Sequence, residues 1–148
     1  MEMDWSKETG GDYEVYPEGT YQLRLNDWER IEANNEKKTK QIRWKFEIVS
    51  PDKYKGKPFT DHSALTEAAL WRTANLVKAF GVDTSECPKM DTDHPVFEAI
   101  INACKERLVY ANMTEETYNG KQNNKVGDYQ PDSHQAIIVP EIPKAVEW

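Results

Sequence analysis

The feature that most constrains the fold is a strict alternation of apolar and polar residues over positions 41–48. The apolar positions are Ile42, Trp44, Phe46 and Ile48. The polar positions between them are Gln41, Arg43, Lys45 and Glu47. A repeat of two residues, rich in β-branched and aromatic types, predicts a strand with one face in the core and the other in solvent. Trp44 is therefore expected in the core, and Arg43 and Lys45 are expected on the solvent face.

The solvent face of this strand belongs to a basic segment of an acidic chain. The chain has a formal net charge of −7, yet residues 30–57 contain nine Lys and Arg against four Asp and Glu. Nucleic-acid-binding domains are usually basic as a whole, but salt screens charges beyond about 10 Å, so a local cluster can act alone. Two interpretations stay open: a surface for an anionic partner, or a solvated strand whose lysines block edge pairing.

Four more strands are predicted around this one, which itself extends over 40–49. They are expected at 20–31, 59–64, 107–114 and 125–129, with a hairpin turn at Asn119-Gly120 between the last two. In the first strand Tyr21, Leu23 and Leu25 are expected to face the core. Beyond Asn26 it stays open which residues face the core and which face solvent, because long strands often bend. On a regular alternation Trp28 would lie on the solvent side.

Two helices are predicted between the third and fourth strands. The first has Thr66 as its cap and Gly81 as its end, and its apolar stripe comprises Leu70, Thr73, Ala74, Val77 and Phe80. Trp71 lies off that stripe and is expected to pack against a neighbouring segment. The second helix begins at Pro95 with Asp93 as its cap, and its inner stripe comprises Phe97, Ile100, Ile101 and Cys104.

These elements predict a mainly β fold with inserted helices, in one domain over residues 1–148. Residues 1–19 are expected to form an N-terminal arm and residues 132–148 a C-terminal extension. Three strands, helices and two more strands follow one another in the order of an OB-fold, a five-stranded antiparallel barrel. That fold offers strands 2 and 3, with the loops between strands 1 and 2 and strands 4 and 5, to single-stranded nucleic acid.

The chain also resembles a family of small bacteriophage and prophage proteins that look like OB-fold single-stranded-DNA-binding proteins. The matching motifs are Met3-Asp4-Trp5-Ser6, Gly10-Gly11-Asp12, Pro17-Glu18-Gly19-Thr20-Tyr21, Tyr54-Lys55-Gly56-Lys57, the helix 65–81, Tyr118-Asn119-Gly120-Lys121, Val126 and Tyr129-Gln130-Pro131. The chain departs from the pattern at Cys104-Lys105-Glu106-Arg107, where a Leu-x-Gly-Lys-like sequence is expected. The resemblance implies single-stranded DNA binding in phage replication or recombination.

Binding a single strand needs cations that follow the phosphates and exposed aromatic faces that stack on bases. The candidates that supply these groups are Arg24, Trp28, Lys37, Lys38, Lys40, Arg43, Lys45, Lys55, Lys57, Tyr118 and Lys121. We expect single-stranded DNA as the partner, together with phage recombination or replication proteins and, as an open alternative, a second copy of the chain.

No set of residues has the spacing of an enzyme site, a cofactor site or a metal site. Asp93-His94 is better explained as a helix cap than as a catalytic pair. Cys87 and Cys104 are far apart without a CxxC motif, so two thiols are expected rather than a disulfide or a zinc site. We therefore predict a protein that is not an enzyme and that has no catalytic residues, metal or cofactor.

The sequence contains no apolar run of 18 residues and no signal-peptide pattern at its start. We expect no membrane association and a location in the cytoplasm of a bacterial host cell. Two alternative functions remain open. The chain could be a protein-interaction adaptor that uses Trp5, Trp71 and Trp148 as anchors, or a DNA mimic that inhibits a host protein through its acidic faces.

Overall fold

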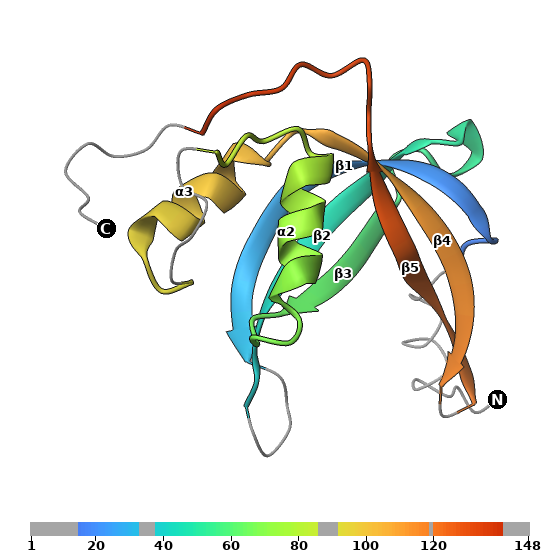
Figure 1. Ribbon diagram of the computed structural model, residues 1–148. Helices are drawn as coiled ribbons and strands as arrows, with labels where there is room; N and C mark the ends of the chain where they lie inside the picture. The colour runs from blue at the N-terminus through green and yellow to red at the C-terminus, as the bar shows by residue number, and fades with distance from the viewer. Residues whose placement is uncertain (1–14, 33–37, 86–91, 119, 141–148) are drawn as a thin grey trace, which may run out of the picture.

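The computed structural model describes residues 15–32, 38–85, 92–118 and 120–140. Within them, the strands form one curved five-stranded antiparallel sheet (Figure 1). The strands are β1 (Gly19–Glu32), β2 (Lys40–Ser50), β3 (Pro58–Ala64), β4 (Leu108–Tyr118) and β5 (Lys121–Pro131). The helices are α2 (Leu70–Ala79) and α3 (Pro95–Ala103), and a 3-10 turn, η1 (Asp52–Tyr54), joins β2 to β3. Helix α2 lies across the sheet, and α3 lies to one side, beyond β1 (Figure 1). The predicted mainly β class, with helices inserted between the third and fourth strands, is confirmed.

The sheet has the order β3-β2-β1-β4-β5 and remains open between its two outer strands. The strands do not form a closed barrel: among the described strands, no backbone ladder joins β3 to β5. Helix α2 packs against both edge strands and lies where such a ladder would form. The edges are linked through side chains instead, because the Tyr129 hydroxyl of β5 donates a hydrogen bond to the Asp61 carboxylate of β3 at 2.6 Å.

The apolar face of β2 forms the centre of the core, as its alternation predicts. Its four apolar side chains, Ile42, Trp44, Phe46 and Ile48, are at most 2% exposed. The Trp44 indole N–H donates to the Ser63 hydroxyl at 2.9 Å, and that hydroxyl is hydrogen-bonded to Thr73 of α2, also at 2.9 Å. These two hydrogen bonds satisfy the polar atoms that are buried with Trp44, so the ring packs without an unpaired donor.

A bulge in β1 reverses which side chains face the core. The pairing of β1 with β2 shifts between Leu25 and Asp27, and beyond the shift Trp28 lies opposite Trp44. A bulge adds one residue to a strand, so every later side chain moves to the other face. Trp28 is consequently half-buried against the core and donates its indole N–H to Asn102 at 2.7 Å. The solvent-side placement of Trp28 by regular alternation is wrong, and Asp27 takes that side.

The predicted stripe of α2 is correct only in part, and the two helices differ from prediction at their starts. Thr73, Val77 and Phe80 are buried as predicted, but Ala74 is exposed, and Leu76 and Ala79 are buried instead. Helix α2 begins without a side-chain cap, and Gly81, with φ +78°, follows its C-cap residue. In α3 the cap is His94 rather than Asp93, because the His94 ring nitrogen accepts a hydrogen bond from the Val96 N–H at 3.2 Å. The inner stripe of α3 is buried as predicted. Trp71 differs from expectation, since it is 61% exposed rather than packed against a neighbour.

The second half of the sheet contains the predicted hairpin. Tyr118 pairs with Lys121, and Gly120 has φ +75°, a left-handed conformation that favours glycine. Strand β5 is longer than predicted. After it, Ile138 forms a parallel bridge with Val82, which attaches this last described segment to the end of α2.

Candidate nucleic-acid interface

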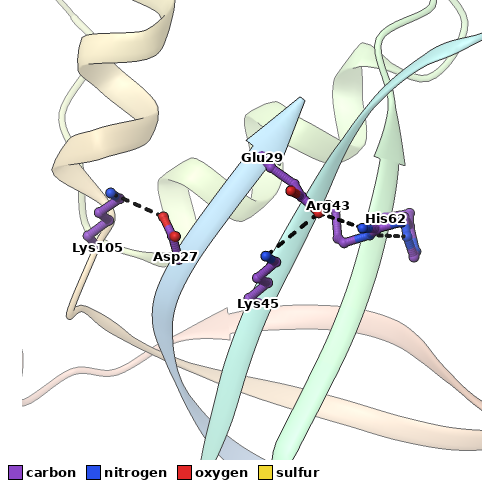
Figure 2. A network of polar contacts seen from close by, with 6 residues as sticks. All are labelled: Asp27, Glu29, Arg43, Lys45, His62 and Lys105. Carbon is purple, nitrogen blue, oxygen red and sulfur yellow. Dashed lines mark hydrogen bonds and ion pairs between the residues drawn. The ribbon is translucent and has the colours of Figure 1, made fainter. Parts of the chain in front are cut away.

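The solvent face of β2 carries the two cations that its alternation predicts. The Arg43 and Lys45 side chains are 40% and 46% exposed. Figure 2 shows both projecting from β2 on the side of the sheet away from the core. Their position follows directly from the burial of Trp44, because neighbouring residues in a strand point to opposite faces.

Carboxylates of the same sheet neutralise these cations. Glu29 of β1 lies between them, with its Oε1 atom 2.5 Å from Arg43 Nη1 and 3.7 Å from Lys45 Nζ (Figure 2). Arg24 is paired in the same way, at 2.9 Å from Glu47. The positive charge counted over residues 30–57 is thus partly cancelled by β1, which the bulge brings opposite β2 with its acids on the outer face.

A second ion pair extends this face toward α3. Lys105 Nζ lies 3.1 Å from the Asp27 carboxylate (Figure 2). The backbone N–H of Trp28 and then Lys105 hold the pKa of Asp27 below its usual value. Asp27 therefore stays ionised at neutral pH. The outer face alternates cations and anions instead of presenting a continuous basic stripe.

The structure adds a histidine to the face. His62 of β3 is exposed and lies opposite Arg43 in the register of β2 and β3. The Arg43 Nε–H donates to His62 Nε2 at 3.3 Å. Sequence spacing gave no reason to join these two residues, because they are 19 positions apart. The register of the predicted β2–β3 hairpin could have indicated that Arg43 and His62 are neighbours, because it determines which residues of the two strands pair.

The remaining candidates are not all brought together. Lys38, Lys40 and Lys55 are exposed, while Lys57 is half-buried. Lys37 lies outside the described residues, and so do the side chains of Tyr118 and Lys121. Glu32, at the end of β1, pairs with Lys40, so the connection between β1 and β2 follows that end. Gly19, at the start of β1, pairs with Met113, so the β4–β5 hairpin lies beyond the other end. The two predicted loops of the site are therefore at opposite ends of β1.

The described residues contain no group of three or more His, Cys, Asp or Glu that could hold a metal ion. None of the helices in the described ranges has the length and apolarity needed to cross a membrane. Cys104 is fully buried, and burial raises the pKa of its thiol to about 12. Cys87 lies outside the described residues.

No family model matches the chain, and no curated protein matches it. The resemblance to small bacteriophage proteins stays a prediction that rests on the order of short motifs in the sequence.

Proposed function

We propose that the protein binds single-stranded DNA, as part of the replication or recombination of a bacteriophage. The observation that carries the proposal is the group of Arg43, Lys45 and His62 on the outer face of β2 and β3. His62 helps to hold the Arg43 guanidinium at its position on the sheet, so part of the ordering of this side chain precedes binding. A phosphate bound to Arg43 would take the place of the Glu29 carboxylate.

The order of the elements supports the proposal. A sheet in which β1 pairs with both β2 and β4, with helices between β3 and β4, is compatible with an OB-fold left open at one edge. OB-folds that bind nucleic acids use the face of strands 2 and 3. The cations Arg43 and Lys45 lie on that face.

One observation favours a second candidate. Asp27, Glu29 and Glu47 lie on the same face as the cations, and the chain has a net charge of −7. A DNA mimic, or an adaptor for a basic protein, would use these carboxylates. The two candidates predict opposite effects of removing the cations, since a mimic would keep or improve its binding while a DNA binder would lose it.

Neutralisation of the cation pair tests the proposal. Fluorescence anisotropy with a labelled oligothymidine compares the wild type with the double variant Arg43→Gln/Lys45→Gln. Loss of two phosphate contacts should weaken binding and flatten the slope of log affinity against log salt by about 1.4. The control Lys89→Gln/Lys144→Gln makes the same change in net charge at two positions outside the sequence ranges of β1, β2 and β3. Equal effects of the two double variants would contradict the proposed site.

A further inference from the structure

A groove runs along the open side of the sheet, between its two edge strands. It has a volume of about 750 Å³ and is lined by residues of β3, α2 and β5. Helix α2 packs against both β3 and β5, and Figure 1 shows it lying across the front of the sheet. The groove exists because the sheet does not close, and it is separate from the outer face of β1 and β2.

An exposed tryptophan lies on the helical wall of this groove. Among the exposed large hydrophobic side chains of the described residues, Trp71 is the one aromatic residue, and it is 61% exposed. Asn75 and Lys78 follow it at helical spacing and line the same groove. An exposed aromatic face of this kind is the group on which an unpaired base can stack.

The groove also holds cations that have no ion-pair partner among the described residues. Arg72, Lys78 and Lys125 line it, and none of the three forms an ion pair with a described residue. This differs from the outer face, where Arg43 and Lys45 are paired with Glu29. Unpaired cations can bind a phosphate without first losing a carboxylate partner.

The acidic residues of the groove are already engaged within the protein. Asp61 accepts the hydrogen bond of Tyr129. Asp128 accepts hydrogen bonds from Asn112 and Gln130, which lower the pKa of its carboxyl. Both carboxylates therefore have internal donors.

We propose that this groove is the base-stacking part of the single-strand site, with Trp71 stacking on a base and Arg72, Lys78 and Lys125 contacting the adjoining phosphates. His62 connects the two regions, because it contacts Arg43 on the outer face and also lines the groove. A strand held at Arg43 would pass over the edge strand β3 at His62 and enter the groove. The proposal rests on the proposed function and assigns it an exposed aromatic residue, which the described residues of β1 and β2 do not supply on the outer face.

The chemistry of the groove selects a single strand. Bases in a duplex are already stacked on each other and cannot offer a face to an indole, whereas unpaired bases stack on aromatic side chains whatever their sequence. An acidic peptide would use the cations but gain little from the tryptophan.

The test is the loss of stacking in Trp71→Ala. Binding of labelled oligothymidine should weaken by roughly 5- to 150-fold, the range expected for one base on one aromatic ring. Trp71→Phe should recover part of that loss. The control Ile137→Ala removes another exposed apolar side chain, 75% exposed and outside the groove lining, and should bind like the wild type. Thermal unfolding checks that the variants remain folded.

A second variant tests the cations. Lys78→Gln/Lys125→Gln should flatten the salt slope by about 1.4. One outcome overturns the groove proposal while the proposed function stands. In it, the wild type binds the oligonucleotide, Arg43→Gln/Lys45→Gln binds it more weakly, and both groove variants bind it as tightly as the wild type. If the wild type does not bind at all, both fail. Binding of polyglutamate as tightly as oligothymidine, with no effect of Trp71→Ala, would also overturn the groove proposal.

Discussion

The carboxylate of Glu29 should oppose DNA binding, and its removal should strengthen it. Glu29 lies 2.5 Å from Arg43 and 3.7 Å from Lys45, so one substitution, Glu29→Gln, releases both cations. A phosphate bound to Arg43 would lie on the order of 4 Å from this carboxylate, and two charges at about that separation in water repel by about 1 kcal/mol. Removing the repulsion corresponds to an affinity gain of about fivefold.

The same substitution should steepen the salt dependence. Glu29 offsets one of the two positive charges, so its removal adds up to about −0.7 to the slope of log affinity against log salt. Between about 50 mM and about 200 mM NaCl, the variant should then lose about threefold more affinity than the wild type. The fold should survive, because an exposed ion pair contributes only about 0.2–1 kcal/mol.

The matched control is Glu98→Gln. Glu98 is 52% exposed and is paired with Arg30 at 3.3 Å, so its substitution makes the same charge change and also breaks one ion pair. It lies on α3, away from Arg43 and Lys45. Anisotropy titrations of both variants at the two salt concentrations show whether Glu29 competes with phosphate for Arg43 and Lys45. Weaker binding by Glu29→Gln, or equal gains in both variants, would refute the competition between Glu29 and phosphate.

Three further predictions concern the fold. Trp44→Ala should lower the free energy of unfolding by about 3–5 kcal/mol in urea titrations, because a fully buried ring is lost and a cavity remains; an unchanged midpoint would contradict the packing. Tyr129→Phe should cost about 1.5–3 kcal/mol through its charge-assisted hydrogen bond. Because burial and then the nearby carboxylate raise the pKa of Tyr129 above 10, the unfolded chain loses this proton first. Wild-type stability should therefore fall above about pH 10, and a smaller fall in the variant is the expected result. In a Cys87→Ser background, Cys104, whose pKa is raised to about 12, should react with a thiol reagent only after unfolding; fast reaction of the native protein would be inconsistent with its burial.

The local elements could be predicted because each depends on a short pattern. The alternation at 41–48 determines which side of β2 is apolar, and only one side of a strand can face the core. The spacing of Phe97 and Ile100 determines the buried stripe of α3 in the same way. Gly120 predicts the last hairpin, because its position in the turn requires a positive φ.

The candidate site could be predicted only in part, because its electrostatics depend on register. The bulge near Asn26 sets which β1 residues lie opposite β2, and one inserted residue exchanges the two faces of the strand. Trp28 therefore lies on the core side, and Glu29 lies beside Arg43 instead. A count of charges along the chain cannot show this neutralisation, since the partners come from different strands.

The position of Trp71 and the open edge of the sheet depend on tertiary packing. A helix with an apolar stripe must cover the core, but the stripe does not determine which strand edges the helix separates. Here α2 packs against both β3 and β5, and its polar side forms a wall of the groove. The helical pattern places Trp71 off the apolar stripe, but the absence of a neighbouring segment over it follows from tertiary packing.

Binding of single-stranded DNA can be measured in one titration. The wild-type chain is titrated into a labelled oligothymidine and, separately, into a duplex of the same length, over a series of salt concentrations. We expect tighter binding of the single strand, with a slope of about −2 to −4 in log affinity against log salt from three to five phosphate contacts. No binding of the single strand at about 50 mM salt, or equal affinity for the duplex, would refute the proposed function.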